Sequence, residues 1–137
     1  PLFYLRAEYN WVRELIKKGN KYYTLCSGES IVDKWAVNFY EKIGERIKLN
    51  QKCAETAELI SFSDYVIQVY IPLGLKQKLD EYLGNLKVLN KIDFNYLIKE
   101  IFEKESEIKV VINRDKKLAE EIQKQTLSKF SSVKSKR

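Results

Sequence analysis

Apolar positions along the chain follow the periods of a strand and of a helix on either side of one small polar turn. Residues 21–26 contain an apolar run that predicts a strand. After the polar residues 27–30, apolar residues recur at the i, i+3, i+4, i+7 spacing of one helix face: Val32, Trp35, Ala36, Phe39, Tyr40 and Ile43. Strand, tight turn and helix in this order are typical of α/β proteins, and the turn leaves free N–H groups at the start of the helix.

The same helical spacing predicts four further helices, over residues 5–18, 75–83, 94–102 and 115–130. Both tryptophans fall within apolar stripes, so we expect them in the core. Three polar residues are expected to cap helices. Ser30, with Asp33 at the acidic position of a capping box, begins the helix that ends at Gly44, while Asp93 and Asp115 begin the two later helices.

The remaining apolar segments predict strands. Residues 46–54 alternate apolar and polar side chains, which indicates a strand with one solvated face. Residues 58–62 and 65–71 are two apolar runs separated by Ser63-Asp64, a pattern that predicts a β-hairpin. Residues 107–113 form the last predicted strand. The chain therefore reads as a single layered α/β domain over residues 1–130, with a mixed sheet, a central β-hairpin and flanking helices, and an α+β arrangement is the alternative.

Charge and composition add little to this picture. The net charge of the 137-residue chain is +6, but three of the positive charges belong to Lys134, Lys136 and Arg137, in a predicted flexible basic tail over residues 131–137.

No apolar run is long enough to span a bilayer and no signal-peptide pattern is present, so we expect a cytoplasmic protein. There Cys26 and Cys53 are expected to be buried free thiols. Abundant lysine and glutamate without methionine suits a thermophile or an AT-rich genome.

The chemistry that is absent excludes several function classes. The chain has no histidine, so Ser-His-Asp and Cys-His catalysis and the usual zinc sites are excluded. Neither a Walker-type loop nor a Gly-x-Gly-x-x-Gly loop occurs, which removes the ordinary ATPase and dinucleotide-binding patterns. No two carboxylates are expected to meet in an apolar setting, where a raised pKa would suit them to acid–base catalysis. We therefore expect no enzymatic activity, no metal site and no cofactor.

The best candidate ligand site is the turn before the helix that begins at residue 31. Ser27, Gly28, Glu29 and Ser30 offer hydroxyls and the positive end of that helix to a small molecule. Glu29 disfavours a phosphate and suits a sugar or a small cationic group. Arg114 directly follows the predicted strand over residues 107–113. If that strand and the strand over residues 21–26 are neighbours in the sheet, Arg114 and the Ser27–Ser30 turn would border one crevice at the carboxyl ends of the strands. The alternative is structural, in which Gly28 allows the turn and Ser30 caps the helix.

A second hypothesis is a small nucleic-acid-associated protein that binds through its last helix and tail. The basic residues are Lys116, Lys117, Lys124, Lys129, Lys134, Lys136 and Arg137. Asp115, Glu120 and Glu121 lie among them, so binding should be weak and steeply salt-dependent. A protein–protein adaptor without a ligand is a third hypothesis.

Two segments resemble the ligand-sensing half of archaeal transcription regulators of the TrmB-like kind, whose effector domains are related to phospholipase D. Residues 57–70 (AELISFSDYVIQVY) are similar to their hairpin with an acidic turn, and residues 108–119 (IKVVINRDKKLA) to their closing strand and helix. The absence of histidine fits such a fold that binds without hydrolysing. These regulators also carry a winged helix, which no segment here matches, so the resemblance implies a sensing domain of a longer protein or a free-standing relative.

Together these observations favour a non-enzymatic small-molecule-sensing or dimerisation domain of a transcription regulator. We expect a homodimer whose effector changes the geometry of an attached or partner module that binds DNA.

Overall fold

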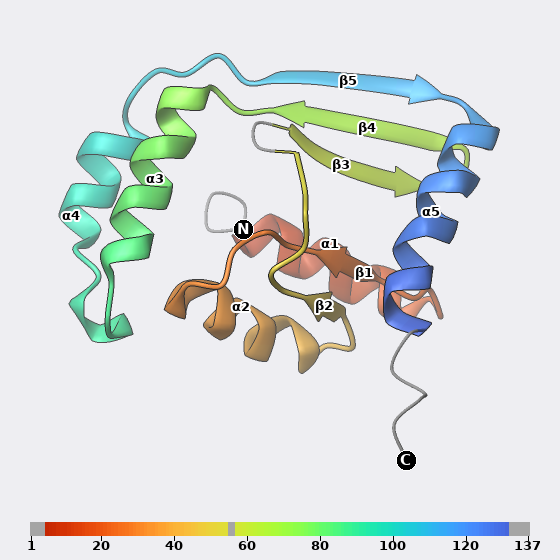
Figure 1. The fold of residues 1–137 in the computed structure, drawn as a ribbon, viewed down its shortest axis with the longest axis horizontal. Coiled ribbons are helices and arrows are strands. Elements are labelled where there is room, and N and C mark those ends of the chain that lie inside the picture. Colours follow the sequence, from red (N-terminus) through yellow and green to blue (C-terminus); the bar gives the residue numbers. More distant parts are fainter. Residues whose placement is uncertain (1–4, 55–56, 132–137) are drawn as a thin grey trace. The chain divides into compact units, whose positions relative to one another are not determined.

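The computed structural model describes residues 5–54 and 57–131 and shows an α/β fold (Figure 1). The α-helices are α1 (Leu5–Lys17), α2 (Ile31–Glu41), α3 (Leu73–Asn85), α4 (Phe94–Tyr96) and α5 (Lys116–Ser131). A short 3₁₀ turn, η1 (Leu89–Lys91), precedes α4, and α4 continues directly into a π-helical segment, η2 (Leu97–Phe102). The strands are β1 (Tyr23–Leu25), β2 (Arg46–Lys48), β3 (Ala57–Phe62), β4 (Tyr65–Tyr70) and β5 (Lys109–Arg114).

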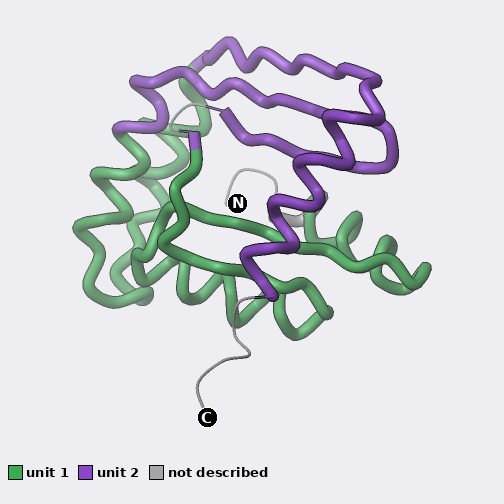
Figure 2. Tube along the Cα trace, turned by 45° about the vertical axis from the view of Figure 1, so that its right-hand side comes forward, with its two compact units in different colours: residues 1–53, 78–104 green, residues 54–77, 105–137 purple. Residues whose placement is uncertain are grey.

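The chain forms two compact units, each with its own small sheet (Figure 2). Unit 1 comprises residues 1–53 and 78–104, and unit 2 comprises residues 54–77 and 105–137. The sequence predicted a single mixed sheet within one domain over residues 1–130. The parallel and antiparallel strand pairs are instead divided between the two sheets.

In unit 1, β1 and β2 pair in parallel, with Thr24 opposite Ile47. Both strands are shorter than the predicted ranges of 21–26 and 46–54. The second strand ends early because Asn50 has a φ of 55°, a left-handed conformation that breaks an extended chain. The chain then turns, and the Gln51 N–H donates to the Cys26 carbonyl at 2.9 Å.

The core of unit 1 is drawn from α1, α2 and η2: Val12, Val32, Ala36, Tyr40, Leu97 and Ile101 are all buried. The sequence predicted one regular helix over residues 94–102, and the structure has a short α-turn followed by the π-helical segment. Trp35 is half-buried and stacks on Phe39 with ring centroids 5.2 Å apart. Trp11 was expected in the core but is exposed, with its ring edge-on to Tyr22.

In unit 2, β4 lies between β3 and β5 and pairs antiparallel with both (Figure 1). The predicted hairpin is present, and its turn contains Ser63 at a φ of 53°. The predicted cap of the last helix is also confirmed, because the Leu118 N–H donates to Asp115 Oδ1 at 3.0 Å. Leu118, an apolar residue in the first turn of this helix, is exposed.

Helix α5 packs on one face of this sheet. Ala119 is fully buried there, and the Ser61 hydroxyl donates to its carbonyl at 3.1 Å. The Gln123 side-chain amide donates to Ser61 Oγ at 3.1 Å and to the Ser63 carbonyl at 3.3 Å. These contacts connect the first half of the helix to the hairpin.

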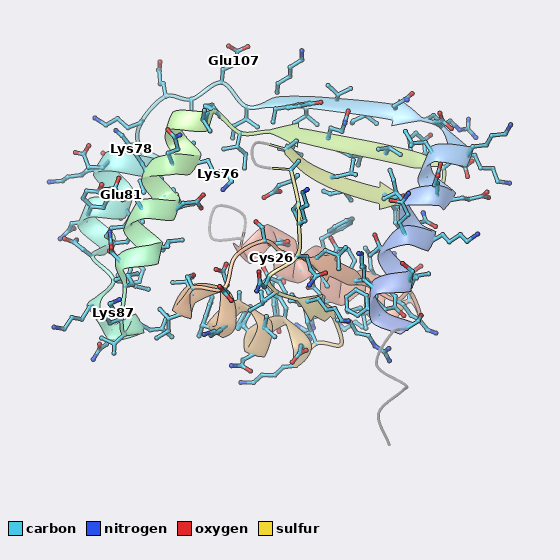
Figure 3. All side chains as sticks on the ribbon, in the orientation of Figure 1. Cys26, Lys76, Lys78, Glu81, Lys87 and Glu107 are labelled. Carbon is cyan, nitrogen blue, oxygen red and sulfur yellow. The ribbon has the colours of Figure 1, made fainter. Side chains whose placement is uncertain are left out.

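Both cysteines are free thiols, as the sequence predicted, but only Cys26, which is labelled in Figure 3, is partly buried. Burial raises the pKa of the Cys26 thiol. Cys53 was expected to be buried and is exposed, with its thiol 3.6 Å from the Leu25 carbonyl. None of the described helices is both long and apolar enough to cross a membrane.

Candidate functional site

The residues of the predicted ligand turn, Ser27 to Ser30, lie between β1 and α2 and are held by a capping box. The Asp33 N–H donates to Ser30 Oγ at 3.2 Å, and Asp33 Oδ2 accepts from the Ser30 N–H at 2.8 Å. The same carboxylate lies against Gly28, where a Cβ atom would clash with it. The helix N-terminus therefore already has a negative charge from its own chain, which matches the structural alternative for Gly28 and Ser30. Ser27 and Glu29 are exposed.

Replacement of Gly28 by alanine tests how much this arrangement contributes to stability. The added methyl group would displace the Asp33 carboxylate and break the capping box, so Gly28→Ala should destabilise the protein by about 1–2 kcal/mol. Gly84→Ala is the matched control, because Gly84 lies in α3 and a Cβ added there would meet no atom within 4 Å, so alanine should be neutral or stabilising. Urea unfolding of both variants checks the difference, and equal effects would contradict the role of Gly28.

Arg114 ends β5 in unit 2. Its guanidinium lies 5.9 Å from the ring centroid of Tyr65 and 3.6 Å from Asp64 Oδ2. The crevice predicted between this residue and the Ser27–Ser30 turn required the two preceding strands to be neighbours. They are not, because β1 pairs with β2 and β5 pairs with β4 in separate sheets.

The predicted nucleic-acid residues are only partly within the described chain. Lys116, Lys117, Lys124 and Lys129 lie on α5, whereas Lys134, Lys136 and Arg137 lie outside the described residues. The Lys116 ammonium is 3.9 Å from Glu120 Oε1. A shallow hollow of about 440 Å³ runs along one side of this helix and is lined by Glu120, Gln123, Lys124, Leu127, Ser128 and Ser131. Acidic and basic side chains are therefore mixed on this side of α5. A surface that binds DNA would instead be expected to carry a continuous stripe of positive charge.

The first feature that sequence reasoning missed is a buried carboxyl group. Glu45 is only 4% exposed, and its Oε1 accepts a hydrogen bond from the Thr24 hydroxyl. Its Oε2 is buried and has no hydrogen-bond partner. Burial raises the pKa of Glu45 to about 7, the nearby Glu8 carboxylate acts in the same direction, and the Thr24 hydrogen bond opposes them.

The Glu8 carboxylate that acts on Glu45 is itself hydrogen-bonded to Tyr40. The Tyr40 side chain is buried, and its hydroxyl donates to Glu8 Oε2 at 2.9 Å. Burial and the charges of both glutamates raise the pKa of this hydroxyl. The expectation that no two carboxylates meet in an apolar setting is therefore wrong. The sequence does not reveal that these two carboxyl groups are near each other, because Glu8 lies on α1 and Glu45 follows α2. They come together only in the folded chain.

A carboxyl group that titrates near neutral pH is suited to proton transfer, but this one is covered by protein and a substrate has no access to it. No three histidine, cysteine, aspartate or glutamate side chains gather as metal ligands anywhere in residues 5–54 and 57–131. The burial of Glu45 therefore predicts a stability that depends on pH.

The second missed feature is the sheet face of unit 2 that lies opposite α5. Alternation along the strands places nine residues on it, which we call the outer face: Glu58, Ile60, Phe62, Tyr65, Ile67, Val69, Val110, Ile112 and Arg114. Phe62, Val110 and Ile112 are 46%, 53% and 66% exposed. A signal was present in the sequence, because strands with nearly continuous apolar runs, such as residues 65–71, are typical of sheets covered on both faces.

Comparisons with models of protein families, with curated proteins and with solved structures found no match to this chain. The functional conclusion therefore depends on the chemistry of the chain itself.

Proposed function

We propose that this chain is a non-enzymatic dimerisation domain of a transcription regulator, and that it associates through the outer face of the unit 2 sheet. The observation that carries this proposal is the exposure of large apolar side chains on a face that α5 does not cover. Soluble monomers seldom leave contiguous apolar patches of more than a few hundred square ångströms in water, and such patches mark interaction surfaces.

The composition of unit 2 supports association. Within its described residues only Val66 and Ala119 are buried apolar side chains, so its core is small for a sheet of three six-residue strands. Covering the outer face would remove Phe62, Val110 and Ile112 from water. Full burial of an exposed side chain of this kind contributes about 1.5–3 kcal/mol, and roughly half of that applies here because these side chains are about half exposed. A second copy of the chain supplies a surface of matching apolar character.

The link to transcription rests on the resemblance of residues 57–70 and 108–119 to the sensing half of TrmB-like regulators. These two segments supply β3, β4, β5 and the start of α5, so they belong to one structural unit. A dimer would set the spacing of two attached or partner DNA-binding modules. Ser27 and Glu29, whose side chains are exposed, are the groups that we propose for contact with a small-molecule effector.

The experiment that tests dimerisation is sedimentation equilibrium of the wild-type chain and of Ile112→Lys. A lysine ammonium in the middle row of the face, on the edge strand β5, should weaken the dimer by about 2–3 kcal/mol, which is roughly a 30- to 150-fold rise in the dissociation constant. Ile112 is 66% exposed, so the substitution should leave the fold of the isolated chain unchanged.

Leu127→Lys is the matched control, because Leu127 is also an exposed apolar residue of unit 2 but lies on α5. It should leave the dissociation constant within about twofold of the wild-type value. A wild-type chain that stays monomeric at the highest concentration reached would overturn the proposal, and equal effects of the two substitutions would move the interface away from the outer face.

A further inference from the structure

The outer face is a three-by-three array of side chains with one charge of each sign. Cross-strand pairing places Glu58, Val69 and Val110 in one row, Ile60, Ile67 and Ile112 in the middle row, and Phe62, Tyr65 and Arg114 in the last row. Ile67 is therefore the central residue. Glu58 and Arg114 occupy diagonally opposite corners, and the other seven positions are apolar or aromatic.

We propose that two copies of this chain stack outer face to outer face, with Glu58 of each copy opposite Arg114 of the other. This inference rests on the proposed function and deepens it, because it specifies the register of the dimer. In a twofold dimer the same patch is used by both copies, so a patch that carries one acid and one base forms two identical ion pairs when the axis exchanges the two corners.

The charges select one symmetry axis. For two sheets packed face to face, the twofold axis lies in the plane of the interface. Four directions through the central Ile67 can be compared: along the strands, across them, along the Glu58–Arg114 diagonal and perpendicular to that diagonal. An axis along the strands places Glu58 on Val110 and Arg114 on Phe62, and an axis across them places Glu58 on Phe62 and Arg114 on Val110. Both leave charges on apolar partners, which is costly.

The other two directions give opposite results. An axis along the Glu58–Arg114 diagonal brings each charge against its own copy, which is repulsive. An axis perpendicular to this diagonal exchanges Glu58 with Arg114 and stacks Ile67 on Ile67. Only this last arrangement pairs every charge and buries apolar groups on apolar groups.

The same axis sets the angle between the two sheets. Strands are about 4.8 Å apart and alternate residues along a strand are about 6.8 Å apart, so the Glu58–Arg114 diagonal makes an angle of about 35° with the strands and the axis perpendicular to it makes an angle of about 55°. Strands of the two copies would then cross at about 70°, which is nearest to the orthogonal class of sheet packing.

Arg114 is already held on this face. Its guanidinium lies over the Tyr65 ring at 5.9 Å and close to Asp64 Oδ2 at 3.6 Å, so part of the entropy of ordering the side chain is already lost in the monomer. Its side chain is 71% exposed and therefore accessible to a carboxylate from a second copy. A patch of three short strands lies at the small end of interface sizes, so we expect a dissociation constant in the micromolar range.

The test is a charge-swap series measured by sedimentation equilibrium on the full chain. Glu58→Arg and Arg114→Glu each place like charges at both corners of the stack and should raise the dissociation constant at least about tenfold. The double variant restores opposite charges with their positions exchanged and should return to within about threefold of the wild-type value. Lys109→Glu is the matched control, since Lys109 is an exposed base of β5 on the opposite face of the sheet, and it should have little effect.

Three other outcomes would overturn this register. If Ile112→Lys disrupts the dimer but the single charge changes do not, the face is the interface and the Glu58–Arg114 pairing is wrong. A double variant as weak as the single variants would also reject the pairing. A chain that is monomeric throughout would reject the proposed function together with this register.

Discussion

Raising the pH from about 4.5 to about 7 is expected to lower the free energy of unfolding by about 3 kcal/mol through Glu45 alone. The folded protein raises the pKa of this carboxyl from 4.5 to about 7, mainly because the group is buried. Below the lower value both the folded and the unfolded chain hold the proton. Between the two values only the folded chain holds it, so stability falls with rising pH, and above about 7 the loss is complete.

Urea unfolding at pH 5 and pH 8 checks this expectation in the wild-type chain and in Glu45→Gln. The amide cannot ionise, so the variant should lose about 3 kcal/mol less than the wild-type chain between the two pH values. Glu41→Gln is the control, because Glu41 lies on the exposed side of α2 and its replacement removes the same charge. Parallel pH profiles for the wild-type chain and Glu45→Gln would show that Glu45 ionises freely in the folded protein.

Glu8 provides an internal check on the cause. Its carboxylate raises the pKa of Glu45, so Glu8→Gln should move the decline in stability to lower pH without abolishing it. A decline that stays at the same pH in this variant would leave burial as the sole cause of the shift.

Ile101→Ala is expected to destabilise the protein by about 2–5 kcal/mol, because it removes a fully buried side chain and leaves a cavity in unit 1. Ile98→Ala is the matched control. It makes the same chemical change within the same π-helical segment, but Ile98 is 45% exposed, so its effect should stay below about 1 kcal/mol.

Tryptophan fluorescence during urea unfolding is a suitable measurement for this pair. Trp11 and Trp35 both belong to unit 1, so the signal reports on the unit that contains Ile101. An equal loss of unfolding free energy in the two variants would show that the side of η2 that carries Leu97 and Ile101 does not pack into a core.

Local signals predicted much of the secondary structure. The Ser30–Asp33 capping box and the Asp115 cap form as expected, because each depends on residues only three positions apart. The hairpin of β3 and β4 also follows from a short turn between two apolar runs. The predicted strand over residues 46–54 was too long because Asn50 adopts a left-handed conformation, which apolar alternation does not reveal.

The environment of the candidate site residues could not be predicted from local patterns in the sequence. The Ser27–Ser30 turn was located correctly between a strand and a helix, but that the Asp33 carboxylate lies against Gly28 follows from three-dimensional packing. Glu45 has no pattern around it that predicts burial, since its surroundings come from α1, β1 and α2.

Local patterns in the amino-acid sequence were enough to predict the α/β class, the helix caps and the hairpin, and the composition alone excluded histidine chemistry. Each of these depends on residue identity or on neighbours within a few positions, where period and side-chain chemistry suffice. The division of the strands into two sheets, the burial of Glu45 near Glu8 and the placement of Glu58 and Arg114 at opposite corners of an exposed apolar face become visible only in the folded chain. Strand pairing and burial depend on contacts between residues that are far apart in the chain. These contacts leave no periodic pattern in the local sequence from which they could be predicted.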